Sequence, residues 1–343
     1  MGDIIQDIKD LKAKLGTEVL ILAHHYQRLG IVDVADHIGD SFGLAKIASE
    51  NTQAKKIVFC GVRFMAESAA ILCRDDQQVY HPEPEAGCPM ADMAPMESVE
   101  EAWKILHTRS DLGFRKIIPV TYMNSHAPLK AFTGLHGGAV CTSSNARKVM
   151  EWAWERGEIL LFFPDQHLGR NTAKTMGLKE EEMKIWYPSK SDGGVDTLEG
   201  VKLLLWNGHC PVHMKFTARD VRFVRKNFPL AKVLVHPECE KEVVDLADAS
   251  GSTEFISNYV RALPSKTQVF IATEQHLIER LKKELPHLRI EFLTRSLCPT
   301  MYMVDLEKLH RTLAQIESEP IVPMPEDIKY PARLALERML ALA

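Results

Sequence analysis

Three cysteines, each followed directly by proline, constrain this chain most. Cys88, Cys210 and Cys298 stand in AGCPMADM, NGHCPVHM and SLCPTMYM. With seven cysteines and 18 prolines in 343 residues, chance predicts about 0.4 such pairs (7 × 18/343), so three are not accidental. Their intervals of 122 residues (210 − 88) and 88 residues (298 − 210) are far longer than those of a local metal knuckle. If the three thiols meet, tertiary structure brings them together.

A second feature occurs three times along the chain: an apolar run that ends in polar residues. Residues 18–27, 115–127 and 231–240 each resemble a buried strand, with HHYQ, YMNS and HPEC at or near their ends. From the polar strand end to the next Cys-Pro pair there are 62 residues in the first case (88 − 26), 88 in the second (210 − 122) and 62 in the third (298 − 236). This regularity predicts internal triplication of a βα unit.

The second unit is longer because of a polar segment at 171–200, which is rich in Glu and Lys and interrupted by Pro188 and Gly193-Gly194. Strands that alternate with helices of about ten residues predict parallel sheets. We therefore expect an α/β fold with three homologous α/β/α layered domains, short parallel sheets and a pseudo-threefold axis with the active site at its centre. The expected domains are 1–92 with a helical tail at 300–343, 93–212 with the insertion, and 213–299.

Composition excludes several classes of protein. The net charge of −4, without a basic stripe, argues against a nucleic-acid partner. The chain has no apolar run of about 20 residues, so we expect no membrane span, and the polar N-terminus predicts no secretory signal. An odd number of cysteines then favours reduced thiols in the cytoplasm, used for metal binding or catalysis. Cys60 and Cys73 lie in apolar surroundings and are expected to be packing residues.

Three converging thiolates can bind a [4Fe-4S] cluster and leave one iron without a protein ligand. Two alternatives remain open at this point. His213 follows Cys210 by three residues and could complete a Cys3His zinc site, or the cysteines could belong to three tight loops and simply pack.

Polar residues at the strand ends and helix starts are the other candidates. A hydroxyl at a helix N-terminus can bind carboxylate or phosphate oxygens, although plain N-capping is the simpler interpretation of any one of them. The candidate hydroxyls are Ser41, Ser143 (or Ser144) and Thr253. Acid, base and hydrogen-bond roles fall to residues at the strand ends, and His-Pro-Glu at 236–238 is the best candidate for proton transfer. These residues are His24, Tyr26, Tyr122, Asn124, His236 and Glu238, with His25, His81, Gln166 and His167 as weaker, supporting candidates.

Taken together, these motifs resemble the quinolinate synthase family, in its longer bacterial type. The likeness runs nearly end to end through AHHYQ, GDS, FCGVRFMAES, EAGCPMADM, TYMNS, CTSSNA, FPDQHLGRN, WNGHCPVH, HPEC, GST and CPTMYM. The resemblance implies three α/β domains and a [4Fe-4S] cluster on Cys88, Cys210 and Cys298. It also implies a condensation of iminosuccinate (iminoaspartate) with dihydroxyacetone phosphate to quinolinate, with loss of phosphate and two waters, in de novo NAD biosynthesis.

The resemblance also implies roles for individual residues. Glu238 and His236 would transfer protons, Tyr26 would assist isomerisation or closure, and His24 would join them in catalysis. The implied substrate-binding residues are His24, Ser41, Tyr122, Met123, Asn124, Ser143, His213, His236, Pro237, Glu238 and Thr253. A transient hand-off of iminosuccinate from L-aspartate oxidase fits the metabolic logic.

Two other functions compete with this one. A different [4Fe-4S] hydro-lyase would use the same open iron on a single hydroxy acid, and it would not release phosphate. A zinc- or iron-binding regulatory protein would not need proton-transfer groups in its cavity, which disfavours that class.

Overall fold

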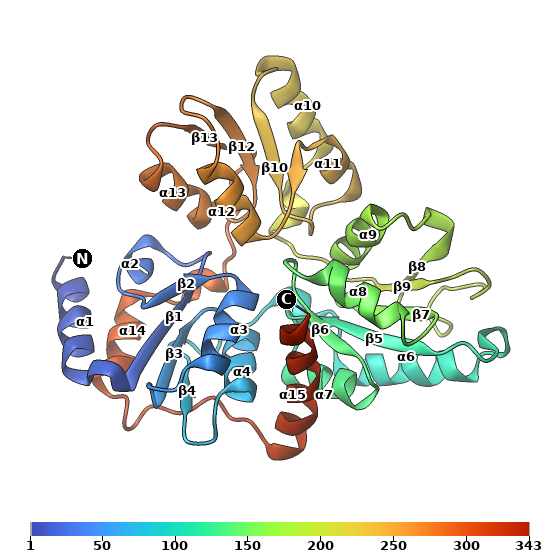
Figure 1. The fold of residues 1–343 in the computed structure, drawn as a ribbon, viewed down its shortest axis with the longest axis horizontal. Helices are drawn as coiled ribbons and strands as arrows, with labels where there is room; N and C mark the ends of the chain where they lie inside the picture. Colours follow the sequence, from blue (N-terminus) through green and yellow to red (C-terminus); the bar gives the residue numbers. More distant parts are fainter. Residues whose placement is uncertain (1, 343) are drawn as a thin grey trace.

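The structure is a computed structural model that describes residues 2–342 and contains three separate sheets. Figure 1 shows three α/β units around a common centre, the first in blue, the second in cyan and green, and the third in yellow and orange. The strands within each sheet pair in parallel. The prediction of an α/β fold with three layered units and short parallel sheets is confirmed.

The three sheets repeat one strand order, in which the second strand of the unit is at the edge and the first lies beside it. The first sheet runs β2 (His37–Gly39), β1 (Val19–His24), β3 (Lys56–Cys60), β4 (Gln78–Tyr80). The third runs β11 (Ala249–Ser250), β10 (Lys232–Val235), β12 (Gln268–Ala272), β13 (Arg289–Phe292). The second runs β6 (Ala139–Cys141), β5 (Ile117–Tyr122), β7 (Ile159–Phe163), β9 (Leu203–Trp206), with β8 (Met183–Trp186) added at its edge.

Two helices recur in every unit, one after the second strand and one after the third strand. The helices after the second strands are α3 (Ser41–Glu50), α8 (Ala146–Trp154) and α12 (Thr253–Arg261). Those after the third strands are α4 (Arg63–Leu72), α9 (Gln166–Thr175) and α13 (Gln275–Glu284). Since the strands are parallel, all six helix N-termini lie at the carboxyl edges of the sheets, where open α/β folds bind ligands.

The remaining helices connect or cover the units. They are α1 (Gly2–Leu15), α2 (Leu29–Val32), α5 (Pro89–Asp92), α6 (Met96–Thr108), α7 (Ala127–Leu135), α10 (Ala218–Asn227), α11 (Lys241–Leu246), α14 (Leu306–Ala314) and α15 (Glu326–Ala341). Five single 3₁₀ turns are η1 (Gly16–Glu18), η2 (Ser110–Leu112), η3 (Glu180–Glu182), η4 (His213–Lys215) and η5 (Met301–Met303). Among residues 2–342, none of these helices combines the length and the apolar character that a membrane crossing demands.

The sheets are short and buried on both faces, as parallel strands under helices require. All residues of β1, β5, β7 and β9 are buried. Cys60 and Cys73 are buried as well, in agreement with their expected packing role. Helix α7 was not anticipated from the sequence. It packs on β5 and β6 of the second sheet.

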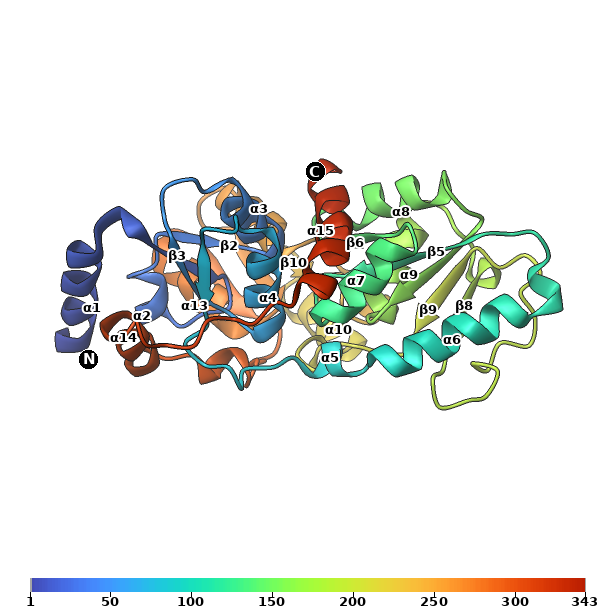
Figure 2. The ribbon, with the colours of Figure 1, turned by 90° about the horizontal axis from the view of Figure 1, so that it is seen from below.

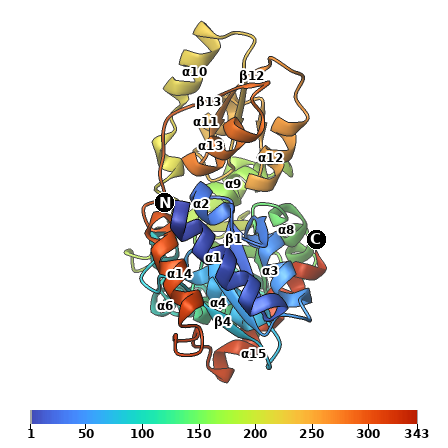
Figure 3. The same cartoon turned by 90° about the vertical axis from the view of Figure 1, so that its left-hand side faces the viewer.

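The C-terminal tail divides between two units. Helix α14 packs on α1, beside the first sheet (Figure 3), whereas α15 packs mainly on α7 and β6 and lies between the first and second units (Figure 2). Gly134 makes the α7–α15 approach close, because a Cβ there would lie 1.9 Å from the carbonyl oxygen of Pro331. The domain division given above stays a prediction, and α15 bridges two of its parts.

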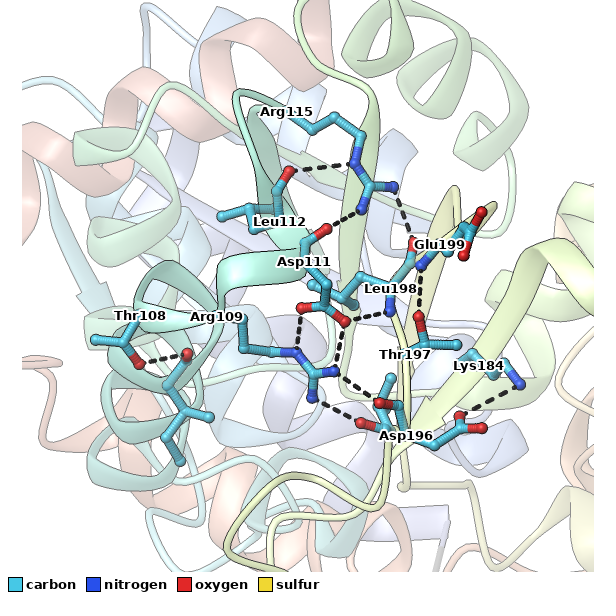
Figure 4. A network of polar contacts seen from close by, with 12 residues as sticks. Thr108, Arg109, Asp111, Leu112, Arg115, Lys184, Asp196, Thr197, Leu198 and Glu199 are labelled. Atoms are coloured by element: carbon cyan, nitrogen blue, oxygen red, sulfur yellow. Dashed lines mark hydrogen bonds and ion pairs between the residues drawn. The ribbon is translucent and has the colours of Figure 1, made fainter.

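The added segment of the second unit is held by a cluster of buried and charged contacts (Figure 4). After α9 the chain forms η3, β8 and a loop that returns to β9. Arg109 donates to both carboxylate oxygens of Asp111 and to the carbonyl oxygens of Val195 (2.6 Å) and Asp196 (3.0 Å). Asp111 in turn accepts from the amide of Leu198 at 2.9 Å. The insertion is therefore an ordered edge of the second sheet.

We predict that Arg109→Ala loosens this loop locally. Hydrogen bonds to charged groups contribute about 1.5–3 kcal/mol each, less where they are partly exposed, so a local loss of about 1–2 kcal/mol is expected. Amide hydrogen exchange at residues 192–201 should then accelerate about tenfold. Arg147→Ala, which breaks an exposed pair with Glu151, is the matched control. Equal exchange rates at residues 192–201 in the two variants would show that Arg109 does not hold this loop.

Candidate active site

One cavity lies where the three units meet, and residues of all three line it. The free space in the cavity and at its open mouth is about 620 Å³. Most of the predicted site residues form its wall: His24, Tyr26, Ser41, Cys88, Tyr122, Asn124, Ser143, Cys210, His236, Glu238, Thr253 and Cys298. The sequence intervals between these residues are long, and the parallel topology brings them together because every unit contributes its strand carboxyl ends.

The three Cys-Pro pairs form one repeated turn. In each, the carbonyl oxygen of the cysteine accepts a hydrogen bond from the amide four residues later, at 3.1 Å for Cys88, 3.2 Å for Cys210 and 3.1 Å for Cys298. Proline suits this position because its fixed φ fits a first helical turn and no donor is lost there. The cysteine side chain is thereby placed at the N-terminal end of a short turn.

The approach to each turn is anchored in the same way. The amide of the first residue of α4, α9 and α13 donates to the carbonyl two residues before the cysteine: Arg63 to Ala86 (2.8 Å), Gln166 to Gly208 (3.0 Å) and Gln275 to Ser296 (2.9 Å). Three equivalent bonds at equivalent places are direct structural support for the triplication predicted from the spacing.

The three cysteines differ from the other four in exposure. Cys88, Cys210 and Cys298 are half-buried at the cavity, whereas Cys60, Cys73, Cys141 and Cys239 are buried. Burial raises the pKa of the Cys88 thiol to about 12 and also raises that of Cys210, where the Glu238 charge adds to the effect. Thiolates at this place therefore need a metal to balance their charge. Three sulfur donors that line one cavity fit an iron–sulfur cluster.

His24 and His236 are held in the same local geometry at the ends of β1 and β10. Each Nδ1 accepts a hydrogen bond from the amide two residues later, Tyr26 N at 3.2 Å and Glu238 N at 3.3 Å. Burial lowers the pKa of both imidazoles, that of His236 to about 3, and neighbouring positive charges lower that of His24 further. Both rings are therefore neutral near pH 7 and carry their proton on Nε2.

Glu238 is the buried carboxylate of the cavity and joins two units. Its Oε1 accepts a hydrogen bond from the Tyr122 hydroxyl at 2.5 Å, and its Oε2 lies 2.7 Å from His213 Nδ1. Burial alone would raise the pKa of Glu238, but the neighbouring His236 and His213 rings and the Tyr122 hydrogen bond lower it. Glu238 is consequently an ionised base, and the same charge raises the pKa of Tyr122 beyond what burial does.

Two helix starts and one turn place hydroxyls in the cavity, and the turn contains Ser143 ahead of α8, which begins at Ala146. Asp40 caps α3 by accepting from Gly43 N at 2.8 Å, so that Ser41 is the first helical residue, and Ser252 caps α12 ahead of Thr253 at 3.2 Å. In the second unit Ser143 lines the cavity, while the Ser144 hydroxyl donates to Asp40 Oδ2 at 2.5 Å. The geometry thus favours Ser143 over Ser144 as the ligand-facing hydroxyl.

Tyr26 crosses from the first unit to the third. Its hydroxyl lies 2.7 Å from the hydroxyl of Thr273, which is also 3.3 Å from His213 Nε2. Burial and the Glu238 charge raise the pKa of Tyr26, so the phenol keeps its proton.

Three predicted substrate-binding residues lie outside the cavity wall. The Met123 thioether accepts from Ser68 at 3.2 Å, the Pro237 carbonyl accepts from Asn171 at 2.8 Å, and His213 sits behind Glu238. Among the weaker candidates, His25 bridges Arg280 (2.7 Å) and Glu254 (3.0 Å) of the third unit. His81 faces the Gly61 carbonyl at 3.0 Å. Gln166 and His167 begin α9, and the side-chain Nε2 of Gln166 donates to Asn207 Oδ1 at 3.0 Å.

Two buried carboxylates next to the cysteine loops were missed. Asp165 caps α9, and Glu274 caps α13 and also accepts from Cys298 N at 3.4 Å. Both are fully buried, and burial raises the pKa of each. A signal for them existed, since Asp-Gln-His at 165–167 and Glu-Gln-His at 274–276 repeat at the same place in two units.

The neutral His236 generates a prediction about pH. Because its folded pKa, about 3, is below the unfolded value near 6.5, the unfolded chain binds a proton that the folded chain does not. The stability contributed by His236 is therefore present above pH 6.5 and falls by about 1.5 kcal/mol between pH 6.5 and 5. In urea unfolding, His236→Gln should remove this part of the acid sensitivity. His287→Gln, which removes an exposed histidine, is the control. If the unfolding free energy of His236→Gln depends on pH as that of wild type does, the His236 ring is not held neutral in the folded protein.

Comparison with known proteins gives one consistent result. The family model described as quinolinate synthetase A protein matches residues 6–341. Quinolinate synthase from Corynebacterium glutamicum is 48% identical over 342 residues, covering 98% of this chain and 86% of that protein. The corresponding values are 47% over 339 residues for Geobacillus kaustophilus (97% and 92%) and 44% over 347 for Bacillus subtilis (99% and 93%). The resemblance seen in the sequence motifs is confirmed, and the chain belongs to the quinolinate synthase family of enzymes.

Proposed function

We propose that this chain condenses iminosuccinate with dihydroxyacetone phosphate to quinolinate, with release of one phosphate and two waters, as a step of NAD biosynthesis. Carbon, nitrogen, oxygen and phosphorus balance in this reaction without an oxidant or a reductant. The observation that carries the proposal is the meeting of Cys88, Cys210 and Cys298 with an ionised Glu238 in one cavity.

Cys88, Cys210 and Cys298 would hold a [4Fe-4S] cluster. When bound by three thiolates, such a cluster has one iron open to act as a Lewis acid on a substrate oxygen. The protein contributes hydrogen-bond donors around the sulfurs. The backbone amides of Met90 and Ala91 face the Cys88 sulfur, and the Thr300 hydroxyl lies 3.5 Å from the Cys298 sulfur. Donors of this kind stabilise thiolate charge.

The substrates are anionic, and the cavity offers two helix starts, at Ser41 and Thr253, and the turn before α8 to their carboxylate and phosphate oxygens. Free N–H groups and the helix dipole favour anions at these places, and Ser41, Ser143 and Thr253 each add a hydroxyl donor. The Nε2–H groups of His24 and His236, with the Asn124 amide, add further donors that can orient a substrate.

Proton transfer is assigned to the polar strand ends. Glu238, ionised and held by Tyr122, would accept a proton from substrate carbon, and neutral His236 beside it would donate from Nε2. Tyr26, protonated and next to His24, would assist isomerisation or closure of the cavity. His213 would act as a support, since its Nδ1 lies 2.7 Å from Glu238 Oε2, whereas Met123 and Pro237 would act through their places in the chain between residues of the cavity wall.

Two further parts of the proposal concern the setting of the enzyme. We place it in the cytoplasm, where reduced thiols can hold a cluster. The substrates are small molecules, and a transient hand-off of iminosuccinate from L-aspartate oxidase would shorten the exposure of this intermediate to water.

The cluster is tested on anaerobically purified protein. Wild type should contain about four irons and four sulfides per chain. Cys88→Ala, Cys210→Ala and Cys298→Ala should each lose them. Cys73→Ala removes a buried thiol away from the cavity and should keep the full content. A cluster that survives loss of any of the three cavity cysteines would contradict the proposal.

The chemistry is tested with Glu238→Gln, which keeps the size of the side chain but removes the base. Loss of general-base catalysis should lower kcat by about 100-fold or more while the iron content stays at the wild-type level. Quinolinate and phosphate are measured together. Turnover of a hydroxy acid without phosphate release would favour the rival [4Fe-4S] hydro-lyase.

A further inference from the structure

Three metal-binding side chains of different chemistry meet beside the cavity. The sulfur of Cys210, an imidazole nitrogen of His213 and a carboxylate oxygen of Glu238 all lie within 4.8 Å of one another. His213 is 1% exposed and Glu238 is 3% exposed, so the place is screened from bulk water. Cys210 begins the turn that contains His213, and Glu238 comes from the end of β10 in the third unit.

The His213 ring is arranged as a ligand would be. Its Nε2 faces the Thr273 hydroxyl at 3.3 Å, whereas Nδ1 has no hydrogen-bond partner within residues 2–342, although Glu238 Oε2 is 2.7 Å away. If Nε2–H donates to Thr273, the Nδ1 lone pair points toward a carboxylate oxygen. Two electron-rich atoms at this distance repel each other unless a proton or a metal cation lies between them, so a cation can take the place of the proton here.

The partners of these side chains complete the pattern. Oε1 of Glu238 is occupied by the Tyr122 hydroxyl at 2.5 Å, which leaves Oε2 free. Ligating histidines and carboxylates in metal sites are held by such second contacts, here Thr273 and Tyr122. Tetrahedral zinc with bonds of about 2.0–2.3 Å separates its ligand atoms by about 3.4–3.6 Å. Here Nδ1 and Oε2 are 2.7 Å apart and the sulfur lies within 4.8 Å of both, so small side-chain shifts would reach that spacing.

We propose that the cluster-free protein binds one borderline divalent cation, Zn²⁺ or Co²⁺, through Cys210 Sγ, His213 Nδ1 and Glu238 Oε2, with a fourth position for water. A set of sulfur, nitrogen and oxygen donors selects such ions over Mg²⁺ or Ca²⁺. The site goes beyond the proposed function and shares one cysteine with it. Cation binding and cluster assembly therefore exclude each other, and the cation also occupies the base Glu238.

The test uses Co²⁺ as a visible probe on the cluster-free full-length chain under anaerobic conditions. We expect one Co²⁺ per chain with a thiolate-to-cobalt charge-transfer band that Zn²⁺ abolishes by displacement. Cys210→Ser and His213→Gln should weaken binding more than about 100-fold, and Thr273→Val, which removes a supporting contact, about tenfold. Cys88→Ser and Cys298→Ser should bind as wild type does, which also shows that cysteine replacement leaves the chain folded.

Three results would overturn the inference. Equal loss of binding in all three cysteine variants would place the cation on the three thiolates instead. Failure of wild type to bind one Co²⁺ would remove the site altogether. Undiminished Co²⁺ binding by protein reconstituted with iron and sulfide would refute the mutual exclusion. Cluster formation needs Cys88 and Cys298, whereas the cation site does not, so the two proposals fail on different variants.

Discussion

The short hydrogen bond from Tyr122 to Glu238 is the interaction on which the centre of this structure depends. It connects the second unit to the third inside a region where water is scarce, and a buried carboxylate without such a partner would be strongly destabilising. The contact of Tyr26 with Thr273 does the same between the first and third units. The three units are thus joined at their functional edge by polar side chains that also serve the cavity.

The repetition explains how one small βα unit yields an asymmetric site. Each unit supplies a strand end, a helix start and a Cys-Pro turn, with backbone hydrogen bonds that barely differ. What differs is the side chain at each equivalent place. Strand ends carry histidine in two units and tyrosine in one, and two residues further on they carry Tyr26, Asn124 and Glu238. The backbone is the same in the three units, and the chemistry of the cavity comes from the different side chains at equivalent positions.

Cys210 occupies a special position among the three thiols. Its turn also contains His213, and Glu238 comes close from the third unit, so the electrostatics around this sulfur differ from those at Cys88 and Cys298. The second unit is also the largest, because β8 extends its sheet and α15 covers its other side. The cysteine with the most distinct surroundings therefore belongs to the second unit, which also differs most from the other two in its strands and helices.

Much of the fold and of the site was present in the sequence. Buried runs that end in polar residues are local, so the strands and the cavity-facing residues His24, Tyr122 and His236 could be found from pattern alone. The interval of 62 residues that occurs in the first and third units also predicted the triplication. Cap chemistry was less decisive, because Ser143 and Ser144 are equivalent in sequence and only packing directs Ser144 to Asp40 in another unit.

The sequence by itself determined the repeat, the parallel α/β class, the three cysteines and the family. Tertiary structure decided which side chains face each other across units: Glu238 with Tyr122 and His213, Asp165 and Glu274 beneath the cysteine loops, and α15 against α7. The physical reason is that local hydrogen bonds and periodicity depend on neighbours in the chain. Burial and long-range pairing depend on how the three layers pack against one another.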